Sequence, residues 1–187
     1  RMHTYKHKPF RKTGDDKDAL SGGGDERLKV MVMGGNEEIG RNMTILEYGE
    51  HILIIDMGLQ FPDEDMPGVD YIINNLSWLK GKEKNIRGVV ITHAHYDHIG
   101  GIPHLMPRIG NPPLYATDLT AAIIKKRQED HPGVAPLNLH DVKHDDVIKA
   151  GVFTLEFFGV AHSVPTSMGV IVDTPAGIIE FRVVRIA

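Results

Sequence analysis

Short apolar runs bounded by turn residues fill the chain from residue 28 onward and predict β-strands. Runs of four to eight apolar residues between glycine, proline or charged residues are typical of buried strands. They are LKVMVM (28–33), MTILEY (43–48), HILIID (51–56), GVVIT (88–92), PLYAT (113–117), VFTLEFF (152–158), MGVIVDT (168–174) and GIIEFRVV (177–184). Only Gly49 and Glu50 separate the second run from the third, which predicts a hairpin.

Helical periodicity marks the segments between these runs. VDYIINNLSWLK (69–80) places four apolar residues on one helical face, and Gly81 then ends it. DLTAAIIKKRQED (118–130) predicts a second helix with Asp118 as its cap, and IGGIPHLMPRIG (99–110) a short one. Strands at both ends with helices between them predict a layered α/β sandwich.

The N-terminal segment differs from the rest in pattern and in charge. Residues 1–12 contain five Lys and Arg and no acid, whereas the remaining chain has 16 basic and 25 acidic residues, a formal charge of −9. DDKDALSGGGDE (15–26) is polar and glycine-rich, as linkers are. We therefore expect a basic arm and linker over 1–27 and a folded domain over 28–187. The arm is either a solubilising tail or an electrostatic tether for nucleic acid.

Overall composition narrows the class of protein. A chain of 187 residues with 41% hydrophobic and 25% charged residues is one globular domain or part of a larger one. No apolar run approaches the roughly 18 residues that span a bilayer, and the first residues lack the apolar core of a secretory signal. The chain has no cysteine, which excludes disulfides and thiolate sites and favours the reducing cytoplasm.

The sequence THAHYDHIGG (92–101) contains the chemistry that stands out. It follows a predicted strand and supplies His93, His95, Asp97 and His98 within six residues. His93 and His95 are two residues apart, so on an extended segment they point to the same side and can bind one metal ion. Asp97 and His98 come where the chain turns toward a helix, and they can face a second ion. These ligands favour Zn²⁺, with Mn²⁺ as the alternative because no sulfur enforces zinc.

A fifth candidate ligand, His162, ends the strand in FFGVAHSVPTSMG (157–169). It lies 64 residues after His98, so only folding can bring them together. An isolated histidine at a strand end is more often a hydrogen-bonded structural residue, but the upstream cluster favours metal ligation here. His104 is a weaker candidate, reached from the helix after the motif.

These residues resemble a known family. His93-Ala94-His95-Tyr96-Asp97-His98 is similar to the signature of the metallo-β-lactamase superfamily, and the blocks around it resemble the ribonuclease J group of β-CASP nucleases. The blocks are GGNEEIGRNMTILEYG (34–49), IIDMGLQFPDEDMPGVDYIIN (54–74), VVITHAHYDHIGGIPHL (89–105) and AHSVPTSMGVIVDTPAGII (161–179).

The resemblance implies an αββα sandwich with the active site at the strand ends. By this resemblance His93, His95 and His162 hold one zinc ion, and Asp97 and His98 hold the other. Asp56 matches a family position that supports the metal-binding loop.

The chain departs from the family pattern at its C-terminal end. The family continues after the strand at 177–181 with a segment whose aspartate bridges the metals, and that place holds Val184 here. The β-CASP domain, the last metal-binding histidine and the C-terminal domain have no counterpart. We therefore expect a truncated metallo-β-lactamase-type domain with one tight zinc site and one weak site.

Three functions remain open on this basis. The first is a zinc-dependent ribonuclease that hydrolyses RNA with a zinc-activated hydroxide, in which Asp97 and His98 are the catalytic residues. The second is a hydrolase of β-lactams or esters, and the third is an inactive zinc-binding fragment. RNA is the expected partner, a β-lactam the small-molecule alternative; no membrane is expected, and a homo-oligomer stays open.

Overall fold

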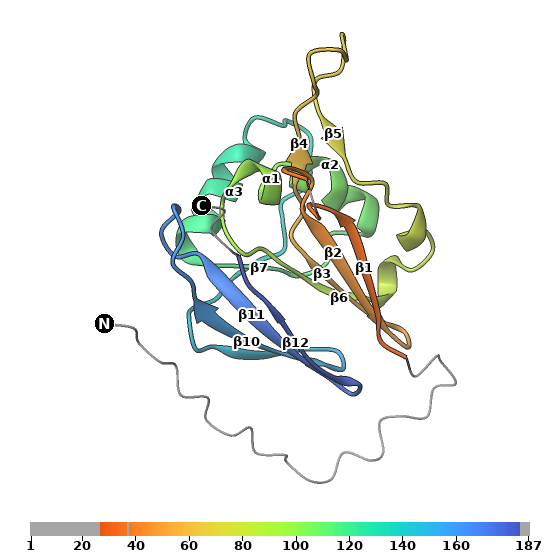
Figure 1. Cartoon of the computed structure of the whole chain (residues 1–187), viewed down its shortest axis with the longest axis vertical. Helices are drawn as coiled ribbons and strands as arrows, with labels where there is room; N and C mark the ends of the chain where they lie inside the picture. The colour runs from red at the N-terminus through yellow and green to blue at the C-terminus, as the bar shows by residue number, and fades with distance from the viewer. Residues whose placement is uncertain (1–26, 37, 184–187) are drawn as a thin grey trace.

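The described part of the chain, residues 27–36 and 38–183 of a computed structural model, builds two β-sheets that face each other (Figure 1). The first sheet has six strands in the order β1-β2-β3-β6-β7-β8, and the second has four in the order β12-β11-β10-β9. The first contains β1 (Lys29–Gly34), β2 (Met43–Tyr48), β3 (His51–Ile55), β6 (Ile86–Val90), β7 (Leu114–Ala116) and β8 (Leu139–Asp141). The second contains β9 (Val147–Ala150), β10 (Phe153–Gly159), β11 (Met168–Thr174) and β12 (Gly177–Phe181).

Strand direction in the six-stranded sheet determines where polar side chains gather. β1, β2 and β3 pair antiparallel, and the expected hairpin joins β2 to β3 with Tyr48 opposite His51. β3, β6, β7 and β8 pair parallel, so their carboxyl ends lie along one edge of the sheet. Asp56 directly follows β3, and the histidine-rich segment follows β6 at the same edge.

The apolar runs are continuous where a strand is buried on both faces. In β3, Ile52 and Ile54 pack toward the helices, whereas Leu53 and Ile55 pack toward the second sheet. A central strand between two apolar layers has no polar face to alternate with, which explains the sequence HILII. The core is therefore two layers, one between the sheets and one beneath the helices.

The helices pack on the outer face of the six-stranded sheet. They are α1 (Tyr96–Ile99), α2 (Ile102–Leu105), α3 (Asp118–Gln128) and the 3₁₀-helices η1 (Ser77–Leu79), η2 (Glu83–Asn85) and η3 (Met106–Ile109). Within the residues described, no helix covers the outer face of the four-stranded sheet, where Val147 and Ile178 are 55% and 63% exposed. None of the described helices has the length and apolar character needed to cross a bilayer.

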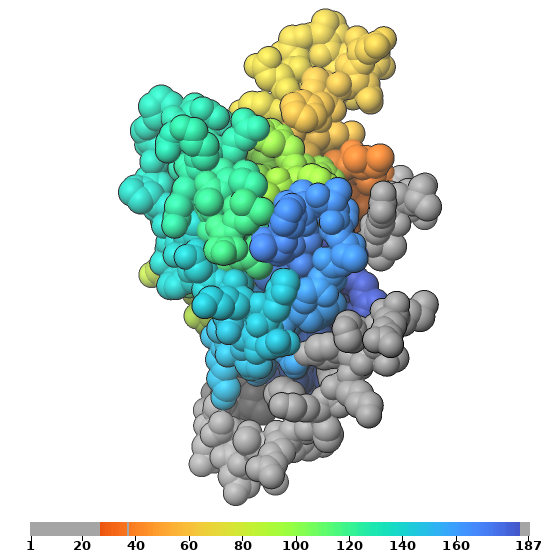
Figure 2. Space-filling view, turned by 90° about the vertical axis from the view of Figure 1, so that its left-hand side faces the viewer, coloured from red at the N-terminus to blue at the C-terminus, as the bar shows by residue number. Residues whose placement is uncertain are grey.

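The helix predicted over 69–80 is wrong. Ile72–Ile73 form the short strand β5, which pairs with β4 (Leu59–Gln60), and only Ser77–Leu79 are helical, as η1. β4 and β5 form the base of a segment that projects from the body (Figures 1 and 2). Val69 and Tyr71 project into solvent with this segment, whereas Ile73, Leu76 and Leu79 pack against the core without forming one helical face.

Two smaller expectations also change. Thr117, not Asp118, is the N-cap of α3, and Asp118 is instead its first helical residue, where a carboxylate favours the helix dipole. The short strands β8 and β9 were not expected, because their sequences are brief and partly charged. The arm and linker proposed for residues 1–27 lie outside the described residues, except for Arg27.

Candidate metal centre

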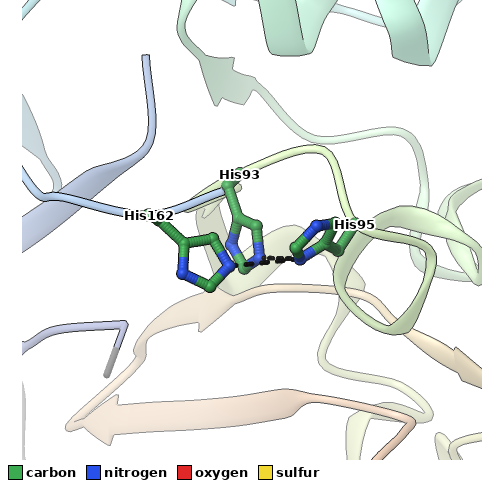
Figure 3. A group of neighbouring side chains, drawn as sticks. All are labelled: His93, His95 and His162. Atoms are coloured by element: carbon green, nitrogen blue, oxygen red, sulfur yellow. Dashed lines mark hydrogen bonds between the residues drawn. The ribbon is translucent and has the colours of Figure 1, made fainter. Parts of the chain in front are cut away.

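Three histidine rings from two sheets converge at one point (Figure 3). His93 and His95 follow β6 in the six-stranded sheet, and His162 follows β10 in the four-stranded sheet. His93 Nε2 lies 2.9 Å from His95 Nδ1, and His162 Nε2 lies 3.2 Å from the same His95 nitrogen. One ring nitrogen from each histidine lies within 4.8 Å of the other two, so the folded chain brings His162 to the upstream cluster.

The spacing and protonation of these rings fit a metal ion. Ligand nitrogens about 2.0–2.1 Å from a tetrahedral zinc lie roughly 3.3 Å apart, close to the distances observed. Burial, together with electrostatic repulsion from His98, His162 and His95, lowers the pKa of His93 to about 2. The His93 imidazole is therefore neutral at physiological pH, which is the form that binds metal.

A second group of ligand atoms lies beside the first. Asp97 and His98 occupy the first turn of α1, and Asp97 Oδ2 lies 3.5 Å from His98 Nε2. His98 Nδ1 donates a hydrogen bond to Asp56 Oδ2 at 2.7 Å. Burial disfavours the charged form of His98, but the Asp56 carboxylate outweighs it and raises the His98 pKa. Because Nδ1 is bound to Asp56, His98 Nε2 is left on the side of Asp97.

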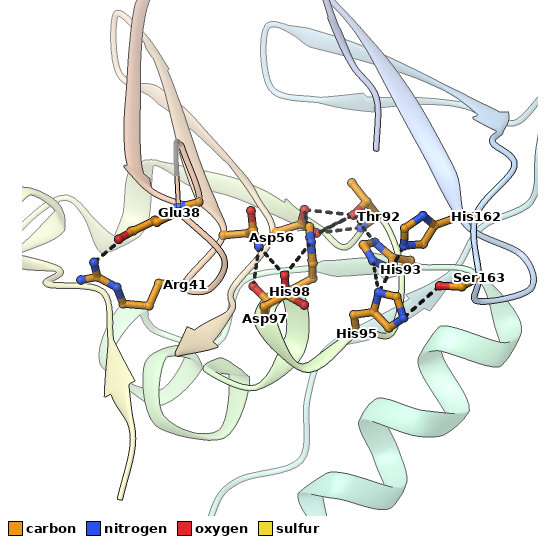
Figure 4. A network of polar contacts seen from close by, with 12 residues as sticks. Glu38, Arg41, Asp56, Thr92, His93, His95, Asp97, His98, His162 and Ser163 are labelled. Carbon is orange, nitrogen blue, oxygen red and sulfur yellow. Dashed lines mark hydrogen bonds and ion pairs between the residues drawn. The ribbon is translucent and has the colours of Figure 1, made fainter. Parts of the chain in front are cut away.

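Asp56 is held in an unusual backbone conformation. Its φ is +62°, in the left-handed region that few residues other than glycine adopt. Its amide donates to Val90 O at 2.8 Å, and its carboxylate accepts the Thr92 amide at 2.8 Å and the Thr92 hydroxyl. Asp56 thus links the end of β3 to the end of β6 and to His98 (Figure 4).

The two groups open into one cleft of about 950 Å³. The loop between β1 and β2 forms one wall through residues 34–36, Glu38, Ile39 and Asn42, and Phe181–Val183 contribute on the opposite side. Arg182 is the only lysine or arginine among the described residues that line the cleft. Ser163 also lines it, with its hydroxyl 3.3 Å from His95 Nε2.

The loop that carries His162 is fixed to α3. Thr166 has φ +60°, rare for a β-branched residue, and its hydroxyl lies 3.0 Å from that of Thr117, the α3 cap. Met168 N donates to Thr92 O at 2.9 Å and ties the start of β11 to the histidine-rich segment. These contacts place His162 opposite His95.

The position of His104 does not support a role as a metal ligand. The His104 ring stacks on Tyr71 with centroids 4.3 Å apart, and His104 Nδ1 lies 3.2 Å from the Tyr71 hydroxyl. His104 is absent from the cleft lining, so it belongs to the base of the projecting segment. Val184, where the bridging aspartate was expected, lies outside the described residues.

The chain is similar to proteins of one known superfamily. The family model described as "Metallo-beta-lactamase superfamily" matches residues 37–179. The chain is 38% identical over 165 residues to ribonuclease J of Thermus thermophilus, and this alignment covers 84% of this chain and 29% of the relative. It is 36% identical over 148 residues to ribonuclease J 1 of Streptococcus pyogenes, covering 79% and 26%. The chain thus spans between a quarter and a third of the length of these curated relatives.

Solved structures resemble the fold. A protein of unknown function from Enterococcus faecalis has a TM-score of 0.63 at 19% identity, covering 82% of this chain and 42% of that one. The metallo-beta-lactamase fold protein YhfI from Bacillus subtilis has a TM-score of 0.58 at 21% identity, covering 82% and 61%. At these identities the likeness concerns the fold alone.

Proposed function

Because the chain belongs to the metallo-beta-lactamase superfamily, we propose that it is a metal-dependent hydrolase and that its substrate is RNA. The observation that carries the proposal is the convergence of His93, His95 and His162 beside Asp97 and His98 in an open cleft. Similarity to ribonuclease J sequences supports RNA as the substrate class.

The residues have distinct roles in this proposal. His93, His95 and His162 would hold one divalent ion, and Asp97 and His98 would hold a second more weakly. Zn²⁺ suits a set of imidazoles and a carboxylate, and Mn²⁺ is the alternative. A divalent ion in this position would lower the pKa of water and so supply a nucleophile at neutral pH. Asp97 would accept a hydrogen bond from the attacking water and orient it toward phosphorus.

The charge of the cleft favours a second candidate. Arg182 alone contributes a permanent positive charge among its described lining residues, and the chain after residue 12 carries a formal charge of −9. RNA-binding surfaces are usually basic. A small substrate such as a β-lactam or an ester needs no extended basic surface, so hydrolysis of these compounds is the alternative. A metal-binding chain without turnover is the third outcome.

Chelation tests the proposal directly. The chain should cleave a single-stranded RNA, lose cleavage after exhaustive EDTA dialysis, and recover it with Zn²⁺ or Mn²⁺. His95→Ala should lose at least a hundredfold in rate, whereas His140→Ala, an exposed histidine bonded to Asn138, should match the parent. Cleavage that survives both EDTA and His95→Ala would refute the metal-dependent reaction, and turnover of a chromogenic β-lactam without RNA cleavage would favour the second candidate.

The cellular location is a further part of this proposal. The chain has no cysteine to protect or to oxidise, and its proposed substrate is made inside cells. We place it in the cytoplasm, and fractionation of cells that express the tagged protein tests this placement.

A further inference from the structure

Asn42 lies immediately before β2, 55 residues before Asp97, yet its side chain donates two hydrogen bonds to that one residue. Asn42 Nδ2 donates to Asp97 Oδ2 at 2.9 Å and to the Asp97 carbonyl oxygen at 3.1 Å. A side-chain amide has two N–H donors, so both are used on Asp97. The Asn42 backbone amide donates to the same carbonyl oxygen at 2.9 Å.

These bonds replace the turn that α1 lacks. α1 is a single turn, so the carbonyl groups of Asp97 and His98 have no helical N–H four residues later to accept from. Asn42 supplies the donors for Asp97, and Met57 N donates to His98 O at 2.8 Å. The backbone that carries both ligand side chains is therefore fixed from outside its own helix.

The backbone packs closely around the Asn42 side chain, with no space for a Cβ atom at two neighbouring glycines. A Cβ at Gly35 would collide with the Asn42 side-chain oxygen, and one at Gly58 would collide with the Asp97 carbonyl oxygen. Gly35 also has φ +87°, which other residues rarely adopt. The two glycines let the β1–β2 loop and the end of β3 close on α1.

Asp97 Oδ2 lies between the Asn42 amide and His98 Nε2. A carboxylate oxygen has two lone pairs, so the hydrogen bond from Asn42 uses one and leaves the other on the side of His98 Nε2. Without Asn42 the Asp97 side chain could rotate about its terminal torsion, which is broad for aspartate.

We propose that Asn42 is a positioning residue: it orients the Asp97 carboxylate so that Asp97 and His98 together form the second metal position. The inference rests on the proposed function in requiring that this position exists. It assigns no contact between Asn42 and the metal or the substrate. Partners that orient metal ligands typically change metal affinity by about 10–100-fold when they are removed.

Zinc titration of the purified full chain, starting metal-free and followed by calorimetry, tests the inference without any substrate. Asn42→Ala keeps the backbone donor but removes the side-chain amide. The second, weaker binding phase should weaken about 10–100-fold, while the phase assigned to the three histidines should shift less than about threefold. Gly35→Ala, which displaces the amide without altering Asn42 or Asp97, should reproduce the selective loss.

Asn74→Ala is the matched control. Asn74 is a buried asparagine that supports the same loop, donating Nδ2 to Arg41 O at 2.8 Å, but it does not contact Asp97. Its removal should leave the ratio of the two affinities unchanged even if the chain loses stability. Equal weakening of both phases in Asn42→Ala, unchanged second-phase affinity, or a parent chain that binds one ion only would each overturn the inference. Two intact phases without RNA cleavage would instead refute the proposed ribonuclease and leave the role of Asn42 standing.

Discussion

At the scale of single residues, Asp56 shows how much depends on one buried carboxylate. It accepts two hydrogen bonds from Thr92 and one from His98, and it does so at a positive φ that disfavours most side chains. Aspartate and asparagine tolerate this conformation better than other residues with a Cβ. Position 56 therefore requires a residue that tolerates a positive φ and that offers two acceptor oxygens.

Asp56→Asn separates these two requirements. Asparagine keeps the shape and the backbone tolerance, but its NH₂ group faces donors that need an acceptor. Leaving one buried donor unpaired costs about 1–3 kcal/mol, so the metal-free variant should lose that much in free energy of unfolding by urea titration. Asp63→Asn, the same change at an exposed aspartate of the projecting segment, is the control and should stay within about 0.5 kcal/mol. An unchanged free energy in Asp56→Asn would show that the His98 bond is not stabilising.

Sequence alone identifies the candidate metal ligands that are close together in the chain. His93, His95, Asp97 and His98 stand out by their spacing, and the structure brings His162 to them. The sequence around Asn42 does not indicate its role, because its partner Asp97 is 55 residues away. A single asparagine before an apolar strand is common and does not point to a metal site. Residues that support ligands from another element emerge only when the fold is known.

At the scale of elements, Glu47 joins three parts of the structure. Its β2 carboxylate accepts from Lys29 of β1, from Trp78 Nε1 of η1 at 2.9 Å, and from Lys82 at 2.9 Å. Burial alone would raise the Glu47 pKa, but the bonds from Lys82, Trp78 and Lys29 outweigh it and lower the pKa below the ordinary 4.5. Folding therefore favours the charged form of Glu47.

Glu47→Gln should destabilise the chain in a pH-dependent way. Because the folded pKa is lowered, the contribution of the charge is complete above about pH 4.5 and declines as pH falls through the folded pKa. We expect a loss of about 1 kcal/mol at pH 7, with a smaller difference from the parent at pH 4, measured by urea unfolding at both values. Glu64→Gln in the projecting segment is the exposed control. A difference that grows toward low pH would contradict this account.

The strands were easier to predict than the elements between them. The runs at 43–48 and 168–174 match β2 and β11, because a strand buried in a two-layer core requires a continuous apolar run. A helix is predicted over 69–80 because Ile72, Ile73, Leu76 and Leu79 fit a helical period. The backbone at Ile72–Ile73 instead pairs with β4. Ile73, Leu76 and Leu79 pack against the core although the backbone over 69–76 is not helical. Periodicity therefore shows which residues are buried, but it does not show which backbone conformation buries them.

At the scale of the whole molecule, charge divides the chain. Residues 1–12 carry five basic residues and no acid, ahead of an acidic remainder. Removing residues 1–27 should leave the free energy of unfolding and the metal content unchanged, because the segment offers no apolar face to the core. If the arm contacts RNA, its removal should also flatten the dependence of binding on salt by about 0.7 per lost phosphate contact. Fluorescence anisotropy at several salt concentrations measures this slope, and an unchanged slope would leave the arm as a tail.

The two proposed metal positions should differ in affinity. Three histidines form a complete set for one zinc ion, whereas Asp97 and His98 supply only two protein ligands for the other. Elemental analysis of the chain at limiting zinc should give about one ion, rising only at higher zinc. Val184→Asp should tighten the second position if residue 184 keeps the family register, with Ile178→Asp, on an exposed position of β12, as the control. Two equally tight sites in the parent would show that another ligand is present.

The three histidines follow strands of two different sheets, so a metal ion bound by all of them would connect the sheets. His95 and His162 are 67 residues apart in sequence and belong to segments that follow strands of opposite sheets. An ion held by both would act as a removable cross-link across the sandwich, present only in the folded chain. At a free concentration one hundred times its dissociation constant, such an ion adds about 2.7 kcal/mol to the free energy of unfolding. Resistance to heat would then depend on the free zinc concentration, and loss of the ion would weaken the cohesion between the two sheets at the same time as it stopped the proposed hydrolysis.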